Sequence, residues 1–247
     1  YGIIGIELSR KSGCWVGIKC VHDNVSSGAT VDLDENRVVL KDISEENYPS
    51  DGLNIRLKDT AQEKEYRLHH HKLKYVKDYC KVNNLNRLIF DSEKPRIGII
   101  STGKSFLDTK LGLEKVGINK EVANKIGIKF LKIAMPWPLE ETVIEQFAEN
   151  LEKIIVVEEK RSIIETQVKE ILFNKKLKVK VVGKKDENGN DLFVSSGALD
   201  PGQIGLKIYE TIKYLQLPKD VTNFSMELKS LTESTNSNIS LKRIPHF

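Results

Sequence analysis

Strand-like and helix-like segments alternate between residues 95 and 183, and this alternation limits the fold more than any other feature of the sequence. The apolar runs "RIGIIS", "IKFLKIAM", "KIIVVEE" and "KVKVVGKK" are typical of buried strands. Between them lie segments with helical spacing, such as "EETVIEQFAENL" and "SIIETQVKEILF". Strands that alternate with helices form βαβ units, in which helices cover a parallel sheet. The sequence therefore predicts an α/β fold with a mainly parallel sheet.

The segment before this region predicts the closing piece of another α/β unit. "GIIGIELSRKSG" has helical spacing that ends at Gly13, and "CWVGIKCV" predicts a short strand. "ATVDLDENRVVL" alternates apolar and polar residues around a turn, which predicts a hairpin or an edge excursion. Residues 41–56 are rich in turn formers and predict a surface loop. A polar helix follows in "AQEKEYRLHHHKLKYVKDYCKVNNL" and is expected to end at Asn83 and Asn84.

After the alternating region, "LDPGQIGLKIYETIKYL" predicts one more helix. Asp200 is placed to cap its N-terminus and Pro201 to occupy its first turn. Beyond Pro218 the chain becomes rich in Ser, Thr and Asn, as in "LTESTNSNIS", and predicts a tail or linker.

Composition and charge exclude several classes of function. The 247 residues are 39% hydrophobic and 30% charged, with a formal net charge of +4 that is spread along the chain. A nucleic-acid-binding face needs basic residues gathered together, so no nucleic acid is expected as a partner. No segment approaches the ~20 apolar residues that a membrane-spanning helix needs. Cys14, Cys20 and Cys80 form no CxxC pair and are odd in number, which favours a reducing, cytoplasmic location.

The turn "STGK", Ser101–Thr102–Gly103–Lys104, is a candidate ligand or interface edge. It joins a strand to a helix, and a helix N-terminus behind a glycine-containing turn can hold an anion. Ligands of open α/β sheets favour the carboxyl ends of the strands. The spacing is not that of a phosphate-binding GxxxxGK loop. The simpler interpretation is an ordinary turn packed against a neighbouring domain.

Histidine and cysteine give no metal site and no catalytic residue. His69, His70 and His71 are consecutive, and consecutive helix residues point about 100° apart, so a solvated helix face is the better interpretation. None of the three cysteines has a histidine or asparagine partner nearby in the sequence, which favours buried structural thiols over a nucleophile.

Trp137 stands between two prolines in "MPWPL", where a strand ends and a helix begins. The prolines stiffen the turn, so the indole is held in one place. Two interpretations stay open: Trp137 closes the core, or it anchors an interface, where tryptophan is enriched.

The four charges Glu158, Glu159, Lys160 and Arg161 follow an apolar strand directly. Consecutive strand residues face opposite ways, so one carboxylate can cap or pair inward while the other meets solvent. The two cations precede a helix N-terminus, which the helix dipole disfavours, so they are expected to have an anionic partner elsewhere. The order of residues predicts a ligand or interface edge at Glu158 and Glu159, on the same edge of the sheet as the turns "STGK" and "MPWP".

Five stretches in order resemble the fused indolepyruvate:ferredoxin oxidoreductases. They are "CWVGIKCV", "DGLNIR", "RIGIISTGKSFLD", "IGIKFLKIAMPWPLE" and "ENLEKIIVVEEKRSIIETQVKEILFN". The resemblance implies residues 1–40 as the tail of a pyrimidine-binding domain and residues 41–94 as a linker loop and helix. Residues 95–217 would form a three-layer domain like the C-terminal domain of transketolase. Residues 218–247, which end in "LKRIPHF", would lead toward a diphosphate-binding domain.

The resemblance also implies a function for the parent enzyme. It would use thiamine diphosphate, magnesium and iron–sulfur clusters to decarboxylate aryl pyruvates oxidatively, giving acyl-CoA and reduced ferredoxin. This segment carries none of the cofactor ligands of that family, so it is expected to be a scaffold and a homodimer interface, inactive alone and completed by other domains of the enzyme. Two alternatives are a self-standing α/β ligand-binding module and a structural subunit of a multi-chain oxidoreductase.

Overall fold

The computed structural model describes residues 1–44 and 48–238, which divide into two compact units. The first unit comprises Tyr1–Asn86 and Met135–Val143, and the second comprises Arg87–Ala134 and Ile144–Phe247. The predicted run "LKRIPHF" lies outside the described residues. Among the described residues, no helix combines the length and the apolar character needed to cross a membrane.

The second unit is built on a five-stranded sheet in the order β1-β3-β2-β4-β5. The strands are β1 (Arg87–Phe90), β2 (Ile97–Thr102), β3 (Ile128–Ile133), β4 (Lys153–Val157) and β5 (Lys180–Val182). The pairs β3–β2, β2–β4 and β4–β5 are parallel. Ile97 of β2 lies opposite Ile128 of β3 and Lys153 of β4. Only β1, at one edge, runs antiparallel. The mainly parallel sheet expected from the sequence is confirmed, and its antiparallel edge strand is an addition.

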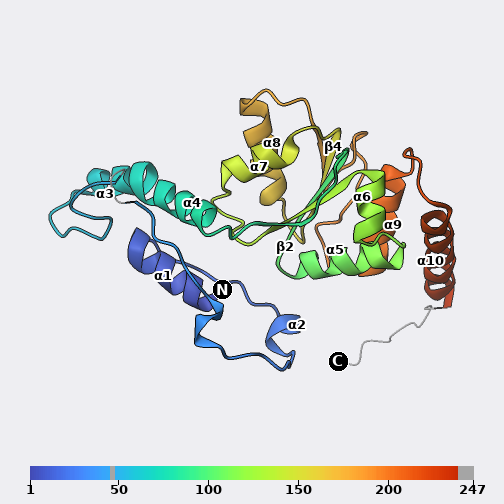
Figure 1. The fold of residues 1–247 in the computed structure, drawn as a ribbon, viewed down its shortest axis with the longest axis horizontal. Coiled ribbons are helices and arrows are strands. Elements are labelled where there is room, and N and C mark those ends of the chain that lie inside the picture. Colours follow the sequence, from blue (N-terminus) through green and yellow to red (C-terminus); the bar gives the residue numbers. More distant parts are fainter. Residues whose placement is uncertain (45–47, 239–247) are drawn as a thin grey trace, which may run out of the picture. The chain divides into compact units, whose positions relative to one another are not determined.

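Helices cover both faces of this sheet and make the expected three layers. On one face lie α5 (Gly103–Lys115), α6 (Lys120–Ile126) and α9 (Pro201–Ile212), and on the other lie α7 (Glu141–Ala148) and α8 (Ile164–Asn174) (Figure 1). Ile97 and Ile99 of β2 point into the first of these layers, beside Phe106 and Leu113 of α5. Gly98, between them, faces the other layer, where an added Cβ would lie 2.6 Å from Phe147 and Leu151. This alternation is the period of a strand buried on both faces.

The first layer is held by a very close helix crossing. Cβ atoms built on Gly112 of α5 and Gly205 of α9 would lie 2.5 Å from the carbonyl oxygen of Pro201 and 2.3 Å from that of Gly112, respectively. The helices therefore approach almost backbone to backbone. Asp200 caps α9 as predicted, since its Oδ1 accepts a hydrogen bond of 3.0 Å from the Gln203 amide. The segment after Pro218, expected as a tail or linker, is helical in α10 (Lys219–Asn238).

The first unit is largely helical and surrounds a small core. It contains α1 (Gly2–Ser12), α2 (His22–Val25), α3 (Ala61–Arg67) and α4 (Leu73–Val82). α1 ends at Gly13 in the left-handed conformation, as predicted. The core gathers Leu8, Leu53, Tyr75, Val76 and Tyr79.

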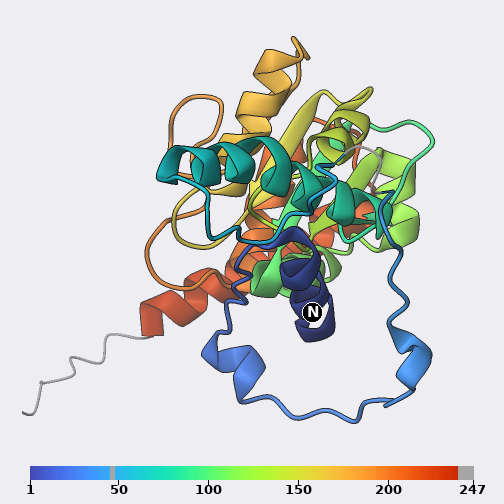
Figure 2. The same ribbon diagram turned by 90° about the vertical axis from the view of Figure 1, so that its left-hand side faces the viewer.

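Two local predictions in the first unit are wrong. Residues 14–21 are extended but pair with no other strand, and residues 29–40 form no hairpin, containing only a 3-10 turn at Glu35–Arg37 (Figures 1 and 2). A strand needs a neighbour to bond its backbone, and the described residues supply none here. The three histidines lie in a π-helical turn, Leu68–Lys72, where His69 and His70 are exposed as expected.

Candidate functional site: the carboxyl edge of the sheet

The parallel register brings two predicted stretches, residues 101–104 and 158–161, to one edge of the second unit. Ser101 is paired with Val157 in adjacent strands, so the turn after β2 lies beside the turn after β4. Glu159 reaches Lys104 across this edge with an oxygen–nitrogen distance of 3.7 Å. The sequence therefore predicted correctly that these residues share an edge.

The hydroxyl groups of the first turn fasten the sheet. Ser101, which is fully buried, donates a hydrogen bond of 2.8 Å to the carbonyl oxygen of Val157 in β4. Thr102 donates one of 2.8 Å to the carbonyl oxygen of Ile133 in β3. Each hydroxyl has a single proton to donate, so both are occupied by the backbone of a neighbouring strand. Neither group is placed as a nucleophile or as a donor to a ligand.

Lys104 is engaged by carboxylates. Its ammonium lies 2.7 Å from Asp108 Oδ2, one helical turn further along α5, in addition to its contact with Glu159. These two carboxylates offset the charge of the Lys104 ammonium, so this lysine is poorly placed to attract an anion. The anion-binding interpretation of the "STGK" turn is thus disfavoured. The i,i+4 spacing of Lys104 and Asp108 was a signal in the sequence that could have revealed the pair.

Glu158 caps the helix that follows it. The residue is only 4% exposed, and its two carboxylate oxygens accept hydrogen bonds from the amides of Ile163, Ile164 and Glu165 at 3.0–3.1 Å. These amides are the unpaired donors at the start of α8, where a carboxylate is also favoured by the helix dipole. One carboxylate does cap inward, as the strand alternation predicted.

Two of the other three charges hold loops together. Glu159 accepts a hydrogen bond of 3.2 Å from the Leu199 amide, and Lys160 donates one of 2.6 Å to the carbonyl oxygen of Gly197. Lys160 adopts the left-handed conformation, with φ of 59°. The expected anionic partner of Lys160 is therefore wrong, because a carbonyl takes that place. Arg161 is exposed.

A partly buried lysine completes the edge, and sequence reasoning did not single it out. Lys184, after β5, donates to the carbonyl oxygen of Glu158 through Nζ, while its amide donates a hydrogen bond of 2.9 Å to Glu165 Oε2. Burial lowers the pKa of Lys184, against the opposing effect of Glu158, Glu165 and Glu159. Nothing in the local pattern "VVGKK" distinguishes this lysine from its neighbours.

Trp137 belongs to the first unit and is 63% exposed. Since most of the indole is in contact with solvent, Trp137 does not close the core. The interface interpretation is the one that its exposure favours.

The described residues offer no complete ligand set for an iron–sulfur cluster or another metal centre. An iron–sulfur cluster needs four cysteine thiolates, and the sequence has three cysteines. Cys80 is buried, and burial raises the pKa of its thiol to about 12. Within residues 1–44 and 48–238, no group of three or more His, Cys, Asp or Glu side chains is arranged to hold a metal ion.

Comparisons with known proteins agree on one family. The family model described as "Indolepyruvate oxidoreductase domain" matches residues 87–237. The subunit IorA of indolepyruvate oxidoreductase from Pyrococcus abyssi is 33% identical over 92 residues, which are 37% of this chain and 13% of that protein. The subunit from Methanothermobacter marburgensis is 29% identical over 115 residues, which are 47% of this chain and 17% of that protein. The chain thus matches less than a fifth of the length of these relatives.

Two solved structures align with part of this chain. A 2-oxoglutarate:ferredoxin oxidoreductase from Magnetococcus marinus aligns with a TM-score of 0.43 and 13% identity, over 78% of this chain and 30% of that one. A split-gene transketolase described as an inactive beta4 tetramer aligns with a TM-score of 0.36 and 14% identity, over 52% of this chain and 41% of that one.

Proposed function

The chain belongs to the indolepyruvate oxidoreductase domain family, and we propose that it serves as a non-catalytic scaffold and interface segment of a larger 2-oxoacid:ferredoxin oxidoreductase. In the parent enzyme, other domains would bind thiamine diphosphate, magnesium and iron–sulfur clusters and would convert aryl pyruvates to acyl-CoA with ferredoxin as the electron acceptor. Residues 1–40 would belong to a pyrimidine-binding domain, residues 95–217 to a transketolase-like domain, and residues 218–247 to the connection that follows.

The observation that carries this proposal is the internal saturation of the carboxyl edge. Ligands of open α/β sheets favour this edge, yet Ser101, Thr102, Lys104, Glu158 and Glu159 all bind other parts of the same unit. An edge whose polar groups are already satisfied supports its neighbours and leaves little to hold a substrate. Trp137, exposed and held between prolines, is the anchor that we propose for the homodimer or domain interface.

Calorimetric titration of the isolated chain with CoA, and separately with thiamine diphosphate and Mg²⁺, tests the proposal. We expect no saturable heat with either ligand. Saturable binding of CoA or thiamine diphosphate that is lost in Lys104→Ala would instead support the alternative of a self-standing ligand-binding module. Lys110→Ala, which removes the same charge at an exposed position of α5, is the matched control.

A sequence test is independent of folding. Genomic sequencing of both flanks is expected to reveal a thiamine-diphosphate-binding domain encoded with this chain, in frame or as a neighbouring gene. A neighbouring gene whose product co-purifies with the chain would favour the multi-chain alternative. Flanks without any such domain would remove the basis of the proposal.

A further inference from the structure

Residues 14–20 of the first unit form an extended segment, and from residue 15 onward its backbone groups make no hydrogen bond with other described residues. Within the described part of the chain, no hydrogen bond involves the main-chain groups of residues 15–20. The segment, "CWVGIKC", is rich in the residue types that favour strands. Trp15 is 98% exposed, and Val16 and Ile18 are also exposed. Unpaired amides and carbonyls beside exposed apolar side chains are the features of a bare strand edge.

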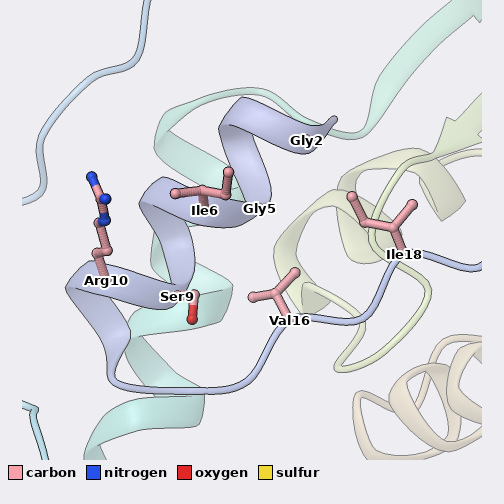
Figure 3. A pocket seen from close by; sticks show the side chains of 7 residues that line it. All are labelled: Gly2, Gly5, Ile6, Ser9, Arg10, Val16 and Ile18. Carbon is pink, nitrogen blue, oxygen red and sulfur yellow. The ribbon is translucent and has the colours of Figure 1, made fainter.

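A groove runs between this segment and α1. Its volume is about 470 Å³, and it is lined by Gly2, Gly5, Ile6, Ser9, Arg10, Val16 and Ile18 (Figure 3). A Cβ built on Gly5 would lie 3.2 Å from Val16, so the segment already packs against the small-residue side of the helix. Ile6 is 58% exposed, and Ile3 is exposed as well. The helix therefore carries apolar surface that the segment does not cover.

The dimensions of helices and strands indicate that a second strand would cover the exposed apolar surface of α1. A helix with its side chains is about 10 Å across, whereas neighbouring strands are about 4.8 Å apart. One helix on a sheet therefore spans about two strands. In α1, Gly5 packs against residues 14–20, which take the place of the first strand. The exposed side chains of Ile3 and Ile6 remain available to a second strand beside it.

We propose that α1 and residues 14–20 form a docking site for one apolar β-strand, supplied by the part of an indolepyruvate oxidoreductase subunit that this chain does not match. The incoming strand bonds the free backbone of residues 15–20 and places alternate apolar side chains in the groove beside Ile6. The identity of the supplier rests on the proposed function, and the strand-binding property itself rests on the groove and the free backbone.

A second copy of the chain fits this site poorly. If residues 14–20 of two copies paired antiparallel, directly opposed side chains would share a face. Both copies of α1 would then cover the same face of adjacent strands. Helix axes need about 8–10 Å of separation, which exceeds the spacing of about 4.8 Å between two strands. The steric conflict favours a strand that brings no helix of its own to that face.

The test uses the full chain and a short capped peptide of alternating valine and threonine, with a variant carrying a central proline as the control peptide. Hydrogen–deuterium exchange is measured at residues 15–20, together with calorimetric binding. We expect the alternating peptide to slow exchange there at least about tenfold, which corresponds to about 1.4 kcal/mol, and the proline peptide to have no effect.

Two substitutions at exposed positions locate the binding. Ile6→Lys is expected to abolish the protection, because a charge then faces the incoming strand. Val31→Lys, at an exposed position away from the groove, is expected to leave it unchanged. Equal exchange with both peptides, or equal protection in both variants, would overturn the proposal. Concentration-dependent dimerisation that Ile6→Lys removes would also overturn it, since the site would then bind a second copy.

The peptide experiment and the cofactor titrations test the strand-docking site and the scaffold function separately. The titrations with CoA and thiamine diphosphate do not depend on the groove. A chain that binds neither cofactor and no peptide would keep its scaffold role and lose only the strand-docking site.

Discussion

At the scale of single residues, Glu158 shows how a charged strand end can be structural. Its carboxylate accepts three amide hydrogen bonds from the start of α8, so the strand and the next helix share one cap. Hydrogen bonds to a charged acceptor are stronger than neutral ones. The capping of α8 is therefore expected to depend on the charge of this side chain as well as on its shape.

Glu158→Gln is expected to destabilise the second unit by about 1–3 kcal/mol, because the amide group accepts through one oxygen only and turns a donor toward the helix amides. Urea unfolding followed by circular dichroism measures the loss. Glu170→Gln, an exposed change of the same chemistry on the same helix, should alter the free energy of unfolding by less than about 0.5 kcal/mol. Equal effects of the two substitutions would contradict the capping role.

Tyr79 gives the opposite expectation. The side chain is fully buried, its hydroxyl has no hydrogen-bond partner among the residues that the structure describes, and burial raises the pKa of the phenol to about 12. Tyr79→Phe removes an unsatisfied group without changing the packed ring, so stability should be unchanged or higher by up to about 1 kcal/mol. Tyr48→Phe is the control, because the Tyr48 hydroxyl donates to Asp78 at 2.5 Å and its loss should destabilise. A large loss in Tyr79→Phe would indicate a bonded hydroxyl.

At the scale of elements, the sequence predicted the strands and helices of the second unit well. β2, β3, β4, α7, α8 and α9 all lie where periodicity placed them. The buried face of α5 was less predictable: Leu107 and Leu111 are exposed, whereas Gly112 and Leu113 face the core. Helical spacing cannot reveal that a backbone-close crossing needs glycine where a leucine would normally pack.

Gly112→Ala and Gly205→Ala are expected to destabilise the second unit by about 1–3 kcal/mol each. Within a helix, alanine is normally more stable than glycine by about 1 kcal/mol, so the expected sign is reversed by the clash with the facing backbone. Thermal unfolding of both variants checks this. Gly2→Ala, a helical position with open space around its missing side chain, should have little effect. Stabilisation by Gly112→Ala would show that the crossing relaxes freely.

At the scale of the whole molecule, the parallel α/β class was predictable from the sequence, but which strand-like segments find a pairing partner was not. Residues 14–21 and 29–40 carry strand-like patterns, and the structure leaves them unpaired because pairing depends on a neighbour that local patterns do not describe. The edge at residues 101–104 and 158–161 was located correctly, since parallel strands end together. The hydrogen bonds that occupy the polar groups of this edge were not predictable, because Lys184 and Leu199, which donate two of them, are distant in the sequence.

The acid stability of the molecule should depend on a network at the opposite, amino edge of the sheet. Hydrogen bonds from Lys153, at 2.5 Å, and from Lys180, at 2.7 Å, hold the pKa of Glu187 below its ordinary value. A lowered pKa in the folded state adds stability at pH values above the unfolded pKa of about 4.3. That stability is lost as the pH falls through the folded value.

Glu187→Gln should therefore be less stable than the unsubstituted chain at neutral pH, and the difference should shrink below a pH of about 4. Urea unfolding across a pH series measures it, with Glu170→Gln as the exposed control. A difference that grows toward acid pH would contradict the assigned sign.

The paired hydroxyls at the end of β2 have a consequence for motion. The Ser101 hydroxyl is hydrogen-bonded to β4 on one side of β2, and the Thr102 hydroxyl is hydrogen-bonded to β3 on the other. These two hydrogen bonds tie the three central strands together at their carboxyl ends, which opposes separation of the strands. Conformational change at this edge is therefore expected in the turns that follow the strands, while the sheet itself stays rigid.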